Sequence, residues 1–139
     1  MTPKISPTKR EVTFRPDEII VSKTDLKGRI TYANRTFAQV AGYSRDELMG
    51  QPHSIIRHPD MPRAVFKLLW DQLAEEKEVF AYVKNMARSG DYYWVFAHVT
   101  PSYDASRKVV GYHSNRRVPD RRVIKEVMEP VYGDLLRIE

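Results

Sequence analysis

Residues 79–117 read VFAYVKNMARSGDYYWVFAHVTPSYDASRKVVGYHSNRR, and this stretch predicts three consecutive strands. It is rich in aromatic and β-branched residues, which are enriched in strands. The turn Ser89-Gly90-Asp91 and a second turn at residues 104–107 divide it. The predicted strands are residues 79–86, 92–103 and 108–117. Strands joined by short turns pair in antiparallel fashion, so this part of the chain predicts an antiparallel sheet.

The residues upstream add two strands and a group of short helices. A turn at residues 25–28 predicts a hairpin, because polar and apolar residues alternate after it. The predicted strands are 17–23 and 29–33, and the predicted helices are 36–41, 44–47 and 62–75. One face of a five-stranded sheet must be covered, and these helices can cover it and enclose a pocket. The expected fold class is therefore α+β.

The two ends of the chain lie outside this predicted sheet. Residues 1–16 contain Pro3, Pro7 and Pro16 among charged and hydroxylated residues, and we expect a flexible N-terminal arm or cap there. Asp120 is a candidate N-cap for a final helix within residues 119–139. Pro130 is expected to kink or interrupt that helix, because proline lacks the N–H that a helix needs.

The composition excludes several classes of protein. The chain has 139 residues and no cysteine, which excludes disulfides, zinc held by cysteine, iron–sulfur clusters and c-type haem attachment. The net charge is +5, and basic residues gather at 116–125, but no nucleic-acid-binding motif accompanies them. We interpret them as a solvated or protein-docking face. We therefore expect no nucleic-acid partner.

The sequence indicates a cytoplasmic protein that is not an enzyme. No apolar run approaches the about 20 residues that span a bilayer, and residues 1–10 lack the apolar core of a signal peptide. Direct membrane insertion is not expected, and a partner would have to recruit the chain to the inner membrane. A phosphate-binding loop, metal-ligand spacing and a nucleophile elbow are all absent from the sequence.

Three stretches of the sequence resemble PAS domains. DLKGRITYAN (25–34) resembles the opening hairpin of that family, and GYSRDELMG (42–50) resembles its second helical turn. GQPHSIIRHPDMP (50–62) is closely similar to the aerotaxis receptor Aer and its stand-alone relative CetB. The resemblance covers residues 17–117. It implies a PAS sensor domain at 17–118, followed by a C-terminal helical signalling or dimerisation segment at 119–139.

The resemblance also implies a cofactor. Members of this group hold FAD non-covalently between the helices and the sheet, and they sense redox or energy state. Carried onto matching positions, it nominates Asn34, Arg57, His58, Asp60, Phe66, Trp70 and Asn85 for the cofactor site. The lack of cysteine excludes the cysteine–flavin adduct of light-sensing PAS relatives.

The chemistry of the nominated residues suits a flavin. Arg57 can donate two hydrogen bonds to a phosphate, and His58 carries a charge that can follow the redox state. Asp60 can orient either of them. Asn85 offers both a donor and an acceptor to the edge of the ring. Phe66 and Trp70 can stack on the ring.

Every nominated residue except Asn85 has a structural alternative, since asparagine is depleted in strands. His58, taken without the motif, would be an ordinary loop histidine. Arg57 and Asp60 can form an ion pair that holds an irregular loop. Phe66 and Trp70 are four residues apart on one predicted helix, which is usual core spacing. Asn34 can serve only as a helix cap.

One stretch departs from the family pattern. Before the first long strand, Aer-type domains often have Gly-x-Pro-Trp-x-Gly, whereas this chain has KEVFAY at 77–82. A bulky Tyr82 would fill a flavin pocket if it pointed inward. Alternation along a strand places Tyr82 on the face of Phe80, opposite Asn85, so FAD remains the expected cofactor.

Two other functions stay open at this point. A haem-binding PAS gas sensor would use His58, His98 or His113 as an axial ligand. A PAS domain without cofactor would act as a dimerisation or docking module. For the flavin sensor we expect a homodimer that signals in trans to a transmembrane chemotaxis receptor or another signalling protein. Its output surface would be the outer face of the sheet and the helix from Asp120 onward.

Overall fold

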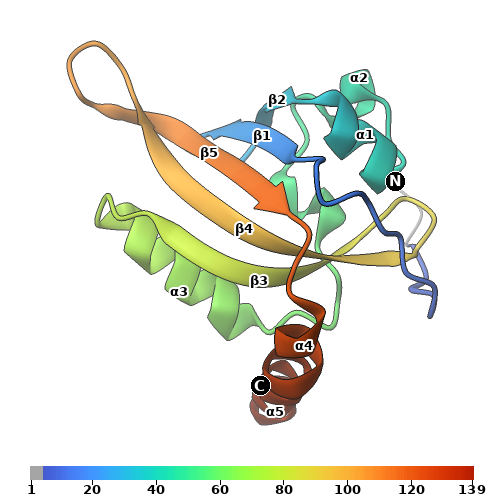
Figure 1. Cartoon of the computed structure of the whole chain (residues 1–139). Helices are drawn as coiled ribbons and strands as arrows, with labels where there is room; N and C mark the ends of the chain where they lie inside the picture. Colours follow the sequence, from blue (N-terminus) through green and yellow to red (C-terminus); the bar gives the residue numbers. More distant parts are fainter. Residues whose placement is uncertain (1–4) are drawn as a thin grey trace.

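The computed structural model describes residues 5–139, and a single curved sheet forms its centre (Figure 1). The strands are β1 (Ile20–Asp25), β2 (Ile30–Ala33), β3 (Val79–Met86), β4 (Tyr92–Tyr103) and β5 (Val109–Arg117). Their spatial order is β2-β1-β5-β4-β3, and the neighbouring strands pair in antiparallel fashion. The prediction of an α+β fold with a five-stranded antiparallel sheet is confirmed.

The helices between β2 and β3 lie against one face of this sheet. They are α1 (Arg35–Ala41), α2 (Arg45–Leu48), the 3-10 helix η1 (His53–Ile56) and α3 (Arg63–Ala74). Ser44 and Glu47 form the predicted capping box of α2. Figure 1 shows α1 and α2 near β2, and α3 beside β3. The core lies between helices and sheet, where Phe37, Ile56 and Tyr93 are fully buried.

The N-terminal segment is paired rather than loose over residues 8–12. The N–H of Thr8 donates to the carbonyl of Gly90 at 2.9 Å, and the N–H of Val12 donates to the carbonyl of Tyr92 at 2.7 Å. Gly90 has a φ of 92°, and a Cβ there would lie 2.2 Å from the Ser6 carbonyl oxygen, so the close approach requires glycine. Of the two alternatives expected for residues 1–16, this pairing fits a cap better than a flexible arm. Residues 1–4, with Pro3, lie outside the described residues.

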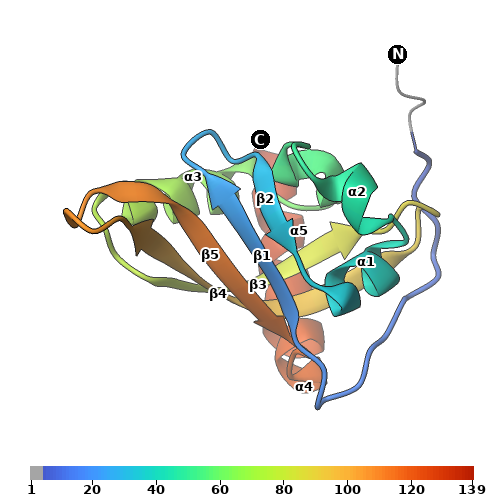
Figure 2. The same cartoon turned by 90° about the horizontal axis from the view of Figure 1, so that it is seen from above.

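The C-terminal segment is one continuous helical rod, which lies below the sheet in Figure 1 and behind it in Figure 2. It contains α4 (Arg121–Val123), the π helix η2 (Ile124–Met128) and α5 (Glu129–Ile138). Asp120 caps it as predicted, accepting from the N–H groups of Arg122 and Val123. Pro130 does not break the rod. The wider π turn that ends just before Pro130 changes the hydrogen-bonding register instead, with the Glu129 N–H donating to the Ile124 carbonyl.

The rod packs on the outer face of the sheet, the face away from α3. The ring of Tyr132 stacks on Trp94 of β4, with 6.1 Å between centroids. The hydroxyl of Tyr132 donates to the carbonyl of Tyr82 on β3 at 2.6 Å. Over residues 5–139, none of the helices has both the length and the apolar character that crossing a bilayer requires.

Candidate cofactor site

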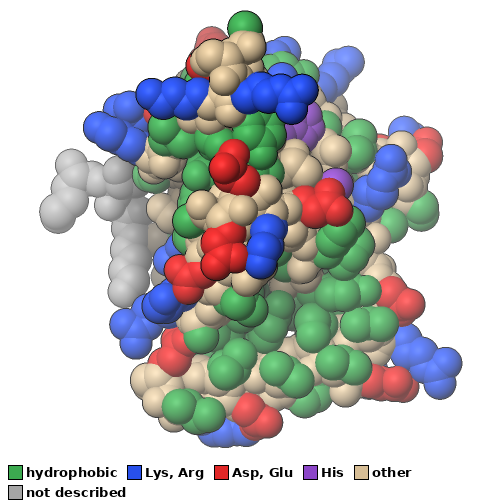
Figure 3. All heavy atoms as spheres, turned by 90° about the vertical axis from the view of Figure 1, so that its left-hand side faces the viewer, with side chains coloured by type: hydrophobic (Ala, Val, Ile, Leu, Met, Phe, Trp, Pro, Cys, Tyr) green, Lys and Arg blue, Asp and Glu red, His purple; other side chains and the backbone are tan. Residues whose placement is uncertain are grey.

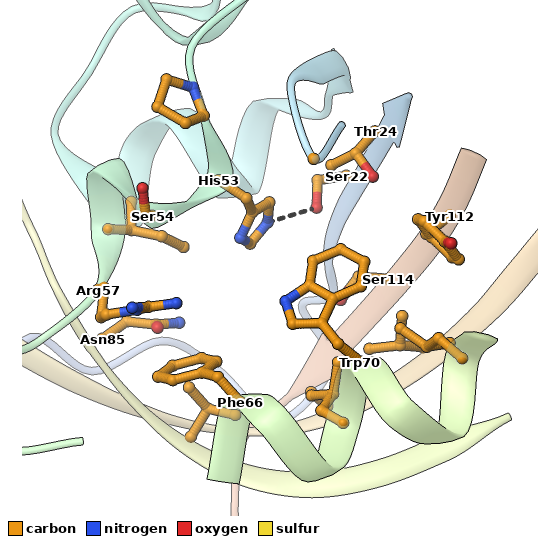
Figure 4. A pocket seen from close by; sticks show the side chains of 18 of the residues that line it. Ser22, Thr24, His53, Ser54, Arg57, Phe66, Trp70, Asn85, Tyr112 and Ser114 are labelled. Atoms are coloured by element: carbon orange, nitrogen blue, oxygen red, sulfur yellow. Dashed lines mark hydrogen bonds between the residues drawn. The ribbon is translucent and has the colours of Figure 1, made fainter. Parts of the chain in front are cut away.

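A cavity of about 220 Å³ lies between the inner face of the sheet, η1 and α3 (Figure 4). The sheet provides its floor through alternate residues of β3, β4 and β5, including Val83, Ala97 and Ser114. Alternation therefore has the predicted consequence: Tyr82 and Phe80 pack with Phe96 on the outer face and stay out of the cavity. The departure from the family pattern at 77–82 does not fill the space.

Four of the seven nominated residues line this cavity: Arg57, Phe66, Trp70 and Asn85. Arg57 follows η1 and pairs through its backbone with Asn85 of β3. Its guanidinium lies 4.0 Å from the centre of the Phe66 ring on α3. Figure 4 shows the Arg57 and Asn85 side chains next to each other at one side of the cavity. Three separate elements thus bring these groups together.

Trp70 lies across the opening of the cavity. Its indole meets Tyr112 of β5 edge to face, with 5.2 Å between ring centroids. A Cβ on Gly28, in the β1–β2 turn, would lie 3.8 Å from the same indole. The side chain is 40% exposed, so Trp70 is a wall of the opening rather than an ordinary core residue.

Asn34 does not line the cavity, and its nomination is corrected. Its side-chain oxygen accepts from the N–H of Phe37 and from the N–H of Val21, both at 3.0 Å. Its amide nitrogen donates to the carbonyl of Ile19 at 2.9 Å. The helix-cap alternative holds, and Asn34 also ties α1 to β1. Its polar atoms are occupied by backbone groups.

His58 and Asp60 also lie outside this cavity, although they follow Arg57 in the sequence. They line a second, more polar hollow between the N-terminal segment, β3 and α5. The backbone N–H of Asp60 donates to Nδ1 of the buried His58 at 3.0 Å. The Asp60 carboxylate accepts from Lys84 at 2.9 Å, so the alternative of an ion pair with Arg57 is wrong. Burial, and then Lys84, lowers the pKa of His58 below its usual value.

The inner wall of the cavity carries three polar residues that sequence reasoning missed: Ser22, His53 and Arg116. Nη2 of Arg116 donates to Oγ of Ser22 at 2.8 Å, and Nη1 lies 2.9 Å from Nε2 of His53. Nε2 of His53 is also 3.1 Å from the Ser22 hydroxyl. The Arg116 guanidinium lies 4.6 Å from the centre of the Phe37 ring.

Arg116 is a buried cation without an anionic neighbour. The residue is 2% exposed, and no carboxylate among residues 5–139 forms a salt bridge with it. Its Nε is buried and makes no hydrogen bond within the described part of the chain. Burial lowers the pKa of Arg116 to about 10, so the side chain stays charged at neutral pH. Assigning Arg116 to the solvated basic face was therefore wrong.

A missed signal in the sequence points to this group. Tyr112, Ser114 and Arg116 are two residues apart on β5, so they share one face of the strand. Ser114 and Tyr112 are part of the same cavity wall. Period-two alternation on β5 therefore separates Arg116, which faces inward, from its exposed neighbour Arg117.

The three histidines proposed as haem ligands do not reach the cavity. His98 contacts Glu78 and stacks on Phe80 on the outer face, and His113 bonds to Asn115. Among the described residues, His53 is the histidine that lines the cavity. Burial, and then Arg116, lowers the pKa of His53 to about 3, so the ring is neutral. An iron on Nε2 would have to displace the Arg116 contact, which disfavours the haem alternative.

Comparison with known proteins assigns this architecture to a family. A family model described as the PAS fold matches residues 30–116. The chain belongs to the PAS family. Among curated proteins, this PAS domain is 41% identical to the aerotaxis receptor of Escherichia coli K12, over 92% of the chain and 25% of the receptor. It is 28% identical to a nitrogen fixation regulatory protein of Klebsiella pneumoniae, over 71% of the chain and 20% of that protein.

Solved structures show the same fold. The dark structure of the LOV domain of the blue-light photoreceptor Aureochrome1 superposes with a TM-score of 0.69 at 22% identity, covering 83% of this chain and 86% of that one. A LOV structure described with a flavin analogue also gives 0.69, at 17% identity, covering 84% and 87%. The PAS domain spans about a quarter or less of the curated relatives it matches. It is a sensory PAS domain related to the aerotaxis receptor.

Proposed function

We propose that this PAS domain binds FAD non-covalently in the cavity beside α3 and senses redox or energy state through it. The buried charge of Arg116 carries this proposal. A buried cation without an anion is costly, and a ligand that brings an electronegative edge or a negative charge offsets that cost. The remaining wall is largely apolar and aromatic, which suits a flat ring with one polar edge.

The donor set fits the polar edge of an isoalloxazine ring. That edge alternates carbonyl oxygens and ring nitrogens, so it needs both donors and acceptors. Asn85 supplies one of each from β3, and Arg116 supplies donors only. Trp70 and Phe66 offer aromatic faces on the opposite wall. Arg57 has no salt-bridge partner within residues 5–139, and we assign it to the phosphates of the cofactor.

A bound flavin supplies reversible electron transfer, and its reduced form can carry a negative charge. Arg116 would stabilise that charge, whereas neutral His53 orients the guanidinium without adding a second cation. The sequence contains no cysteine, so a covalent cysteine adduct is not part of this function. The chain's own residues therefore hold the ring, stabilise its charge and limit access of water.

The partner proposal rests on the relationship to the aerotaxis receptor. We propose that the domain acts in the cytoplasm as a homodimer and signals to a transmembrane chemotaxis receptor or a similar protein. The outer face of the sheet offers the docking surface, because Phe80 is 57% exposed there beside Phe96. Removal of residues 120–139 should impair dimerisation or receptor binding. Unchanged behaviour in both assays would leave the C-terminal rod without an output role.

A visible spectrum of the purified protein tests the cofactor proposal. We expect two broad near-visible flavin bands that bleach with dithionite, and a rise in melting temperature when FAD is added to the apoprotein. A Soret band would instead support the haem alternative. A featureless spectrum, together with no thermal shift on adding FAD, would contradict flavin binding and favour the cofactor-free docking module.

A further inference from the structure

We propose that Glu139 is a positioning residue for the cavity: it caps α3 from the end of α5, and so couples the position of α5 to FAD binding. This inference rests on the proposed function. It starts from the beginning of α3. Pro62 precedes that helix and has no side-chain acceptor for its first N–H groups.

Glu139 supplies the missing acceptors from a distant part of the chain. Its Oε1 accepts from the N–H of Arg63 at 3.0 Å, and its Oε2 accepts from the N–H of Ala64 at 2.9 Å. The Arg63 side chain adds a contact of 3.5 Å to the same carboxylate. A negative charge at a helix N-terminus is favoured by the helix dipole as well as by these bonds. The amides of Ala64 and Arg63 lower the pKa of Glu139, which keeps it charged at neutral pH.

The helix that Glu139 caps forms one wall of the cavity. Phe66 belongs to the first turn of α3, two residues after Ala64, and Trp70 lies one turn later. Phe66 also carries the Arg57 guanidinium on its ring. Fraying of the first turn would therefore displace a ring wall and the proposed phosphate ligand together.

The other attachments of α5 lie on the far side of the sheet. Tyr132 bonds to the carbonyl of Tyr82 and stacks on Trp94, as described above. Tyr82 directly precedes Val83, which lines the cavity floor. One helix thus contacts the backbone beside the floor through Tyr132 and the opposite wall through Glu139. A shift of α5 must alter at least one of the two.

The side of α5 that faces away from the sheet is accessible to a partner. Val131 and Ile138 of α5, with Val127 of the preceding η2, recur at helical spacing and are exposed, Ile138 to 81%. Figure 3 shows hydrophobic side chains gathered along the lower part of the molecule, where α5 lies in Figure 1. A protein that binds this stripe would act on the same helix that caps α3. By linkage, FAD and that partner would then influence each other's affinity by the same factor.

The test compares Glu139→Ala with Glu126→Gln in the 139-residue chain. Glu126 lies on the same rod and, among residues 5–139, pairs only with Arg122, at 3.3 Å, on an exposed surface. We expect Glu139→Ala to weaken FAD binding by about fivefold, as flavin fluorescence titration measures, and the control to leave it unchanged. In the wild type, FAD should also slow amide hydrogen exchange along α5, and Glu139→Ala should abolish this effect.

The outcomes separate the two proposals. Equal FAD affinity in both variants, with no effect of FAD on exchange in α5, would overturn the coupling while FAD binding itself stands. If the wild type binds no FAD, the proposed function fails. Exchange at the Arg63 and Ala64 amides then decides whether Glu139 caps α3, because it should accelerate in Glu139→Ala and not in Glu126→Gln. Melting temperatures of both variants verify that they are folded.

Discussion

Nη1 of Arg116 lies 2.9 Å from Nε2 of His53, and both side chains belong to the inner wall of the cavity. A buried arginine usually meets a carboxylate, but here it meets a neutral ring, whose Nε2 accepts the hydrogen bond from the guanidinium. The contact fixes the direction of the guanidinium and leaves its charge uncompensated. The consequence is an electrostatic field that favours negative charge on whatever occupies the cavity.

Replacing Arg116 by methionine should lower the midpoint potential of the bound flavin. The reduced, negatively charged form loses its buried cation, so the oxidised form gains relative stability. Loss of a tenfold stabilisation corresponds to roughly 30 mV for a two-electron couple and roughly 59 mV for one electron. Spectroelectrochemical titration of the loaded protein measures this shift. Arg117→Met is the matched control, because Arg117 is the exposed neighbour on the same strand. An equal shift in both variants would refute a specific role of Arg116.

The stability of the protein should fall as the pH drops below about 6.5. Burial lowers the pKa of His53 from 6.5 to about 3, so the unfolded chain binds a proton that the folded chain refuses between these values. The stabilisation is complete above pH 6.5 and is lost progressively toward pH 3, by at most about 1.4 kcal/mol per pH unit for this group. Urea unfolding at pH 7 and pH 5 measures how much the free energy of unfolding changes per pH unit.

The variant His53→Gln should flatten part of this pH dependence, because glutamine does not titrate. His58 contributes in the same direction, since burial also lowers its pKa, so the slope should not vanish in His53→Gln. Identical slopes in the wild type and in His53→Gln would show that His53 does not hold its lowered pKa.

The strands were predictable where local pattern and turns coincide. The bounds of β3 and β4 agree with the predicted 79–86 and 92–103, because aromatic and β-branched runs end there at glycine-containing or polar turns. The first strand is different: residues 17–23 were predicted, and β1 spans Ile20–Asp25. Its limits depend on pairing with β5, from Ile20 opposite Arg116 to Asp25 opposite Gly111. The pairing register between β1 and β5 depends on residues far apart in the chain, so the sequence of β1 alone does not predict it.

The site was predictable only in part, for a similar reason. Arg57 and Asn85 were found by resemblance, and the structure brings both into the cavity. His58 and Asp60 are close to Arg57 in sequence, but the chain turns after η1 and carries them to the outer hollow beside Lys84. Arg116 was assigned to the surface because it belongs to a cluster of basic residues. The alternation of β5, which turns its side chain inward, was not taken into account. Proximity along the chain is a weak guide where the backbone is irregular.

Asn34 should matter for stability rather than for the cofactor. Asn34→Ala removes the cap of α1 and the bonds to Val21 of β1 and to Ile19 just before it, so we expect a loss of about 1–2 kcal/mol of unfolding free energy. Asn34→Asp keeps the oxygen acceptor and loses only the donor to Ile19, so its loss should be smaller. Chemical denaturation ranks the two. FAD affinity of the folded variants should equal that of the wild type, and a selective loss of affinity would restore Asn34 to the cofactor site.

Trp70 should control how quickly the cofactor leaves. Its indole bridges α3, Tyr112 and the turn at Gly28 across the opening, so removing it widens the exit without touching the polar wall. We expect Trp70→Ala to accelerate FAD release several-fold, because the variant loses roughly 1 kcal/mol of aromatic contact. The midpoint potential of the flavin should change less than it does in Arg116→Met. Recovery of flavin fluorescence after dilution measures the release rate. Leu68→Ala is the control, because Leu68 lies on the same helix, is 62% exposed and does not line the cavity. Equal release rates in the wild type and in Trp70→Ala would mean that the cofactor leaves by another route.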